Sequence, residues 1–301
     1  MHLSFYLCLM QVEAWRYARE ELFNAHFYSW LADRIKVPEL RKILQDFATE
    51  ERRHYDFWRT YIGKDTDYSG FRLWWYKILV WLLGPTFVIK LLERDEHRII
   101  ESYRRLADFL PSPQREALLS FVEDEEKHEE TFLAAIGDAE PRVKYVGFIV
   151  LGLSDAIIEV TGVHAGFLGI SHRPLVAGIA GLIVGFAASI SMASAAYLQA
   201  KQNHAVSALQ SALYTGFSYL LAVVALALPY FFTDRMLWAF WLSVGMAILL
   251  IVAFVYYSCV LFGRNFRSEA LESIVVLGGT TILSYGFGEV LRRVFPEVTM
   301  G

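Results

Sequence analysis

The chain has 301 residues, 55% of them hydrophobic, and a formal net charge of −4. Its two cysteines are too few for a disulfide framework or a thiolate metal site, and it has no Gly-rich phosphate loop, nucleophile elbow or basic patch. Hydride, acyl and phosphoryl transfer therefore receive no support, and we expect no nucleic-acid partner.

Charge divides the chain into two parts. Residues 1–143 contain 25 acidic and 20 basic side chains, whereas residues 144–301 contain only 7 and 8. An ionic half followed by a nearly uncharged half predicts a soluble domain joined to a membrane domain. The turn-rich stretch 137–141 is the expected boundary, which gives domains of 1–140 and 141–301.

The soluble part is predicted to be a bundle of four amphipathic helices, two of which begin with a proline. An apolar stretch at 73–92 is interrupted by Lys77 and by Gly84-Pro85. We expect a connection or an interfacial helix there and not a membrane span. The four expected bundle helices are 8–35, 38–62, 87–109 and 113–136.

The motif Glu-x-x-His occurs twice in this bundle, at 51–54 and at 125–128. Residues equally far from the turn of an antiparallel helix pair lie side by side. By this rule Glu21 lies beside Glu51. Likewise, Glu96 lies beside Glu125. The sequence therefore predicts two carboxylate pairs, each with a histidine one helical turn further on. The predicted ligands are Glu21, Glu51, His54, Glu96, Glu125 and His128.

One glutamate on each of two helices and Glu-x-x-His on the other two is the ligand arrangement of di-iron and di-manganese carboxylate proteins. Carboxylates bridge and charge-balance two divalent ions, while imidazole suits iron or manganese. A charged helix produces one Glu-x-x-His by chance, but two copies with matching partner carboxylates favour a metal site. Glu93 is an alternative metal ligand to Glu96, or a ligand in addition to it. Three further glutamates are expected on the surface or behind the ligands: Glu20, Glu50 and Glu129.

Five apolar stretches in the second half reach the length of about 20 residues that crosses a bilayer. Glycine pairs four residues apart, Gly162 with Gly166 and Gly181 with Gly185, are typical of closely packed membrane helices. We therefore expect an all-α fold in which a five-helix transmembrane bundle follows the four-helix bundle. The expected spans are 146–170, 174–199, 209–232, 236–262 and 271–291.

Asp155 and Glu159 are four residues apart in the first span, so they share one helix face. Carboxylates inside a bilayer are costly, and two on one face indicate a cation or proton path. The alternative is that Asp155 reaches the membrane interface from near the inner end of the span. Met192 in the second span offers a thioether to a transition metal, or it simply packs.

An odd number of spans places the two termini on opposite sides of the membrane. The apolar N-terminus lacks a basic segment and a cleavage motif, so we read it as the beginning of a helix. We therefore expect an integral protein of the cell (inner) membrane. Its N-terminal domain would lie in the cytoplasm and its C-terminus on the outer side. Five basic residues on the inner side against four on the outer side favour this orientation only weakly.

Both halves resemble known families. The first half resembles the rubrerythrin branch of the ferritin-like superfamily, and its E-x-x-E implies that Glu93 and Glu96 both contact the metals. The second half resembles the vacuolar iron transporter family. Together they resemble iron exporters of the membrane-bound ferritin type. The matching segments are ELFNAHFY (21–28), ERRH (51–54), ERDE (93–96), EEKH (125–128), GLSDAIIEVTGVHAGFLG (152–169) and ISMASAAYLQAK (190–201).

The resemblance implies a homodimeric antiporter that exports Fe²⁺, with Mn²⁺ as the alternative, in exchange for protons. The soluble domain would hold a di-iron centre, as Fe²⁺ or Fe³⁺. Asp155 and Met192 match positions that line the metal path. A glutamate of that family is replaced here by Val184, and Glu159 is expected to supply the missing charge. Two other functions remain open: a membrane-anchored ferroxidase or peroxide-reducing enzyme, and a metal sensor.

Overall fold

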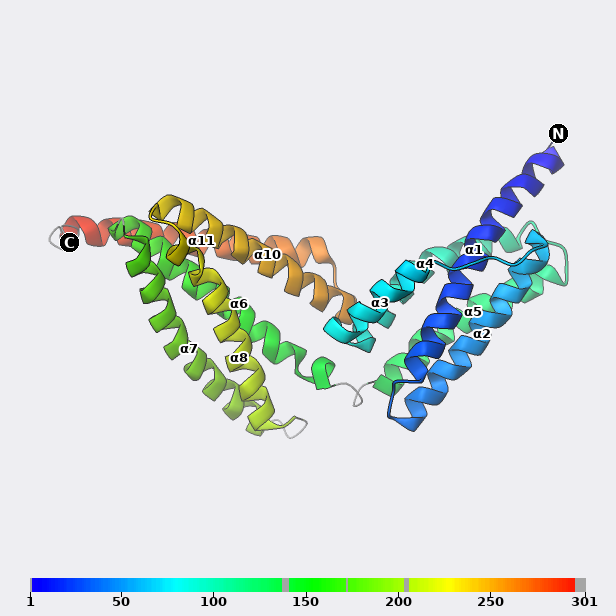
Figure 1. Cartoon of the computed structure of the whole chain (residues 1–301), viewed down its shortest axis with the longest axis horizontal. Helices are drawn as coiled ribbons and strands as arrows, with labels where there is room; N and C mark the ends of the chain where they lie inside the picture. The colour runs from blue at the N-terminus through cyan, green and yellow to red at the C-terminus, as the bar shows by residue number, and fades with distance from the viewer. Residues whose placement is uncertain (1, 137–140, 172, 203–205, 296–301) are drawn as a thin grey trace. The chain divides into compact units, whose positions relative to one another are not determined.

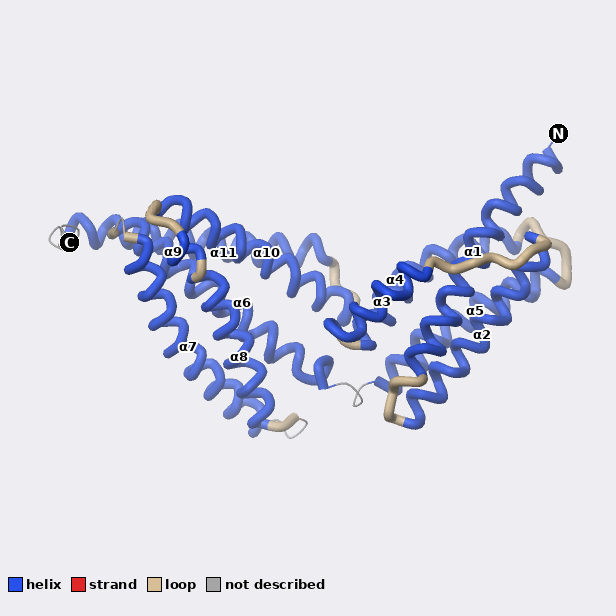
Figure 2. Tube along the Cα trace, viewed as in Figure 1, coloured by secondary structure: helices blue, strands red, loops and turns tan. Residues whose placement is uncertain are grey.

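The computed structural model describes residues 2–136, 141–171, 173–202 and 206–295, and all secondary structure in these ranges is helical. The all-α prediction is therefore confirmed. The chain divides into two compact units, Met1–Pro141 and Arg142–Gly301. Figures 1 and 2 show their helices. Within the helices, the side chains outside the description are those of residues 2–12, 95–98, 129–130, 132–136 and 141–142.

The N-terminal unit contains two antiparallel helix pairs that together form a four-helix bundle (Figure 1). The pairs are α1 with α2 and α4 with α5, and α2 also packs against α5. The bounds of these helices are α1 His2–Ala32, α2 Pro38–Ile62, α4 Pro85–Ala107 and α5 Gln114–Ile136. The four bundle helices lie where the sequence pattern predicts them.

Helix α2 shows why this sequence forms a bundle helix. Its buried residues recur at intervals of three or four, the spacing of one helical face, and they run from Leu40 to Trp58. The helix ends at Gly63, whose φ of 70° is left-handed and whose N–H bonds the Arg59 carbonyl. Trp58, Tyr103 and other large side chains pack in the core at 0% exposure. Each such burial contributes about 1.5–3 kcal/mol.

The apolar stretch 73–92 is divided between two helices. A separate helix, α3 Gly70–Leu83, ends at Gly84, where φ is 94°. Pro85 then begins α4, as its fixed φ suits a first helical turn. The stretch is thus not one connecting element, because its last eight residues belong to a bundle helix.

The C-terminal unit contains five helices long and apolar enough to cross a membrane, as predicted. Each of these spans has 25–29 residues. The third span is formed by α8 and the short α9, which follow one another at Pro229. The bounds are α6 Pro141–Ile170, α7 Pro174–Gln202, α8 Ala208–Ala227, α9 Pro229–Phe232, α10 Met236–Phe262 and α11 Phe266–Val294.

Small residues let these membrane helices approach closely. A Cβ on Gly185 would meet the Val223 side chain, and a Cβ on Gly288 would meet the backbone of Gly166. The side chain of His164 occupies the space next to Gly181. The predicted glycine positions thus lie at helix contacts, as close packing without a hydrophobic driving force requires.

Candidate metal centre

Four buried side chains converge in the middle of the bundle. One nitrogen or oxygen from each of them lies within 4.8 Å of the others. They come from three helices, α1, α2 and α5, and all are at most 7% exposed. The cluster consists of Glu21, Glu51, His54 and Glu125.

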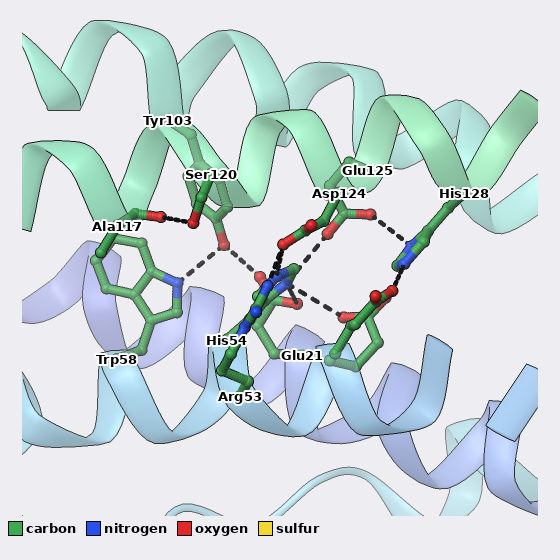
Figure 3. Close-up of polar contacts among 12 residues, drawn as sticks. Glu21, Arg53, His54, Trp58, Tyr103, Ala117, Ser120, Asp124, Glu125 and His128 are labelled. Carbon is green, nitrogen blue, oxygen red and sulfur yellow. Dashed lines mark hydrogen bonds and ion pairs between the residues drawn. The ribbon is translucent and has the colours of Figure 1, made fainter. Parts of the chain in front are cut away.

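The imidazole of His54 lies among the three carboxylates of the cluster. Figure 3 labels two of them, Glu21 and Glu125. Its Nδ1 is 3.3 Å from Glu125 Oε1, 3.7 Å from Glu21 Oε2 and 4.0 Å from Glu51 Oε2. Burial disfavours the charged ring. However, the carboxylates of Asp124, Glu125 and Glu21 outweigh this effect and raise the pKa of His54 to about 11. In this arrangement a proton balances part of the negative charge.

A second histidine lies beside the cluster. Nδ1 of His128 is 3.4 Å from Glu125 Oε2, so Glu125 lies between the two imidazoles. Burial raises the pKa of this carboxyl, but the two histidines prevail and lower it to about 2. Glu125 is therefore ionised at neutral pH.

The outer nitrogens of both histidines contact carboxylates. Nε2 of His54 lies 3.3 Å from Asp124 Oδ2, and Nε2 of His128 lies 2.5 Å from Glu50 Oε2. Asp124 also pairs with Arg53 (Figure 3). When the ring loses one proton, a carboxylate at Nε2 keeps that nitrogen protonated and leaves the Nδ1 lone pair free to bind a metal ion. Neither Nδ1 has a hydrogen-bond partner among the described residues.

These donors fit a divalent metal ion. Three carboxylates and an imidazole are buried together, and buried polar or charged groups require compensating partners. Carboxylate oxygens and imidazole nitrogens are ligands that iron and manganese accept. The geometry is that of a buried Glu/His cluster, held by three helices, that could hold a metal ion.

Comparison with known families identifies the domain that contains this cluster. The rubrerythrin family matches residues 17–136. These residues form a rubrerythrin-type ferritin-like domain. The buried cluster of this ferritin-like domain accordingly indicates iron binding. No curated protein matches the chain, and no solved structure does.

The four-residue cluster does not include two further predicted ligands on α4, Glu93 and Glu96. Glu93 on α4 is 6% exposed, and its Oε2 is 3.9 Å from Lys90 Nζ. The side chain of Glu96 lies outside the described residues. The structure thus brings four predicted ligands together and places His128 next to them. Their role as ligands stays a prediction.

The sequence pattern did not predict the contact of Tyr103 with the cluster. The hydroxyl of Tyr103 on α4 donates to Glu21, and Trp58 Nε1 donates to that hydroxyl over 2.9 Å (Figure 3). Burial raises the pKa of Tyr103 well above its usual value, and the charge of Glu21 raises it further. Tyr103 therefore stays protonated and orients one carboxylate of the cluster.

In the membrane unit, the three predicted path residues have different surroundings. Glu159 on α6 accepts a hydrogen bond from Tyr219 on α8. It also lines a cavity of about 660 Å³ together with residues of α11 and with Val184 of α7. Asp155 is partly buried one turn earlier and does not line the cavity. Met192 packs against the core of the unit.

Proposed function

We propose that this chain is a membrane transporter that exports Fe²⁺, with Mn²⁺ as a second cargo, in exchange for protons. In this proposal the ferritin-like domain lies in the cytoplasm and captures or senses the metal. The observation that carries the proposal is the pairing of two sites in one chain. A buried Glu/His cluster is followed by spans in which a carboxylate, Glu159, lines a cavity.

The ferritin-like domain would bind metal with Glu21, Glu51, His54 and Glu125, and with His128 beside them. Bound iron would supply one-electron redox chemistry toward oxygen or peroxide. The chain itself supplies charge balance and proton release. Because His54 is protonated in the metal-free arrangement, it would have to release that proton before it could serve as a ligand.

In the membrane unit, a carboxylate can hold either a proton or a metal ion, which is the requirement for exchange. Glu159 and Val184 line the same cavity. This supports the expectation that Glu159 supplies the charge that Val184 lacks. The hydroxyl of Tyr219 fixes Glu159 at the cavity wall. Asp155, one turn earlier on the same face, would be the next carboxylate on the path.

Flux measurements on the full chain in proteoliposomes test this proposal. Vesicles with an imposed pH gradient are loaded with Fe²⁺ or Mn²⁺, and metal and proton movements are followed together. Glu159→Gln and Asp155→Ala should each abolish coupled flux. Glu272→Gln, a change of an exposed carboxylate on α11 outside the cavity, should retain it.

Two results would overturn the proposal. Unchanged flux in both Glu159→Gln and Asp155→Ala would show that these carboxylates are not on the path. A wild-type chain that moves no metal but consumes oxygen or peroxide with Fe²⁺ would instead identify a membrane-anchored enzyme.

A further inference from the structure

Helix α3, the short cyan helix in Figure 1, presents a continuous apolar face outside the bundle. At 3.6 residues per turn, the five residues of this face lie within an arc of about 120° around the axis of α3. The exposed fractions run from 48% for Trp75 to 78% for Trp81. This outer face consists of Phe71, Trp74, Trp75, Trp81 and Leu82.

The opposite face of α3 is fixed to the bundle. Arg72 Nη1 lies 2.5 Å from Glu20 Oε2, and the Tyr76 ring meets Phe23 edge-on with centroids 5.2 Å apart. Leu73 is buried. Both cations of the helix thus lie on this inner side, where Lys77 stacks over Trp30. The outer face is therefore a firmly held feature of the folded domain.

Chain connectivity brings the bilayer to this end of the bundle. In the antiparallel pair α4–α5, Pro85 and Ile136 are equally far from the intervening turn, so they lie at the same end. Trp81 and Leu82 lie four and three residues before Pro85. Only residues 137–140 separate Ile136 from the first spanning helix, and a chain extends at most about 3.5 Å per residue. The end that carries Trp81 is thus tethered within a short reach of the membrane.

The size and composition of α3 fit the membrane interface. Its 14 residues are about 21 Å long, which is too short for a hydrocarbon core of about 30 Å. Tryptophan is enriched at the boundary between head groups and acyl chains, and three of the five outer residues are tryptophans. A helix with one apolar face and one polar, anchored face lies in that boundary.

We propose that the outer face of α3 inserts into the interface of the bilayer that holds the five spans. The ferritin-like domain is then attached to the membrane at two places, the four-residue connection and α3. This attachment holds the metal cluster at a set height above the lipid surface. The inference is independent of whether the spans transport metal.

Spin labels on the full chain in phosphatidylcholine–phosphatidylglycerol vesicles test the insertion. The two native cysteines are replaced (Cys8→Ser and Cys259→Ala), and single cysteines are introduced as Trp81→Cys or Trp74→Cys. Phe109→Cys is the matched control, because Phe109 is 71% exposed but lies at the other end of the α4–α5 pair. Retained Mn²⁺ binding shows that each variant is folded.

The labels at positions 81 and 74 should collide more often with oxygen than with a water-soluble nickel complex, and the label at 109 should show the reverse. Two results overturn the proposal. One is a water-like accessibility at positions 81 and 74, equal to that at 109. The other is dipolar broadening at 81 that disappears on dilution with unlabelled chains, because a second copy would then cover the face.

Discussion

Asp124 on α5 reaches across the bundle to His54 on α2, with Oδ2 3.3 Å from Nε2. The reciprocal contact runs from α2 to α5, where Glu50 Oε2 lies 2.5 Å from His128 Nε2. Each acid directly precedes a glutamate of a Glu-x-x-His motif. The acid before each Glu-x-x-His motif therefore orients the histidine of the other motif, so a change in α5 affects His54 and a change in α2 affects His128.

Asp124→Asn should weaken metal binding at the cluster by about 10- to 100-fold, because His54 loses the carboxylate that fixes its ring and tautomer. The measurement is Mn²⁺ titration of the full chain, followed by electron paramagnetic resonance. Glu126→Gln is the control, since Glu126 is exposed and pairs with Arg104 away from the cluster. Equal affinity in wild type and Asp124→Asn would remove the positioning role.

Metal binding should release protons, and the apparent affinity should rise with pH. The reason is that His54 has a pKa raised to about 11 without metal, so binding at its Nδ1 must displace a proton at neutral pH. Calorimetry in buffers of different ionisation enthalpy measures the release. His54→Gln should lower the number of protons released. Identical release in the variant would show that another group carries the proton.

Without metal, the stability of the ferritin-like domain should depend on pH in opposite ways at its two extremes. The pKa of His54 is raised from 6.5 to about 11, so its contribution is complete below about 6.5 and is lost as pH rises through 11. The pKa of Glu125 is lowered from 4.5 to about 2, so its contribution is complete above about 4.5 and is lost as pH falls through 2.

Hydrogen exchange of α2 and α5 in the presence of a chelator measures this dependence. Protection should be greatest between about pH 4.5 and 6.5, after correction for the intrinsic exchange rate. His54→Gln should flatten the alkaline side of the profile. A corrected protection that increases steadily from pH 6 to 10 would contradict the prediction.

Tyr103→Phe should destabilise the ferritin-like domain by about 1–3 kcal/mol, because Trp58 Nε1 and Glu21 both lose a buried hydrogen-bond partner. Tyr61→Phe is the matched control. The buried hydroxyl of Tyr61 makes no hydrogen bond to the described residues, so its removal should be nearly neutral. The two variants are compared by chemical denaturation, with the unfolding of α2 as the measured signal. Equal losses would show that ring packing alone matters.

The sequence pattern was sufficient for the helices because amphipathic and apolar periodicity depend on neighbours in the chain. It also placed Glu21 beside Glu51, since distance from a turn fixes height in an antiparallel pair. Glu50 was expected on the surface or behind the ligands, and it contacts His128. The contact of Asp124 with His54 has a signal in the sequence, the acid before the second Glu-x-x-His motif. The contact of Tyr103 with Glu21 left none, because it depends on side-chain rotamers and on how α4 packs against α1.

Gly288→Ala should separate α11 from α6 and disturb the cavity that Glu159 lines. A Cβ at this position would overlap the carbonyl and Cα of Gly166, and backbone atoms of a packed helix cannot move aside cheaply. We expect a loss of about 1–3 kcal/mol in the detergent-solubilised chain, measured as a fall in the midpoint of thermal aggregation. Gly286→Ala, two residues away on the same helix, meets no atom within 4 Å and should leave the midpoint unchanged. If both variants behaved alike, the close approach of α11 to α6 at Gly166 would not be a determinant of this unit's stability.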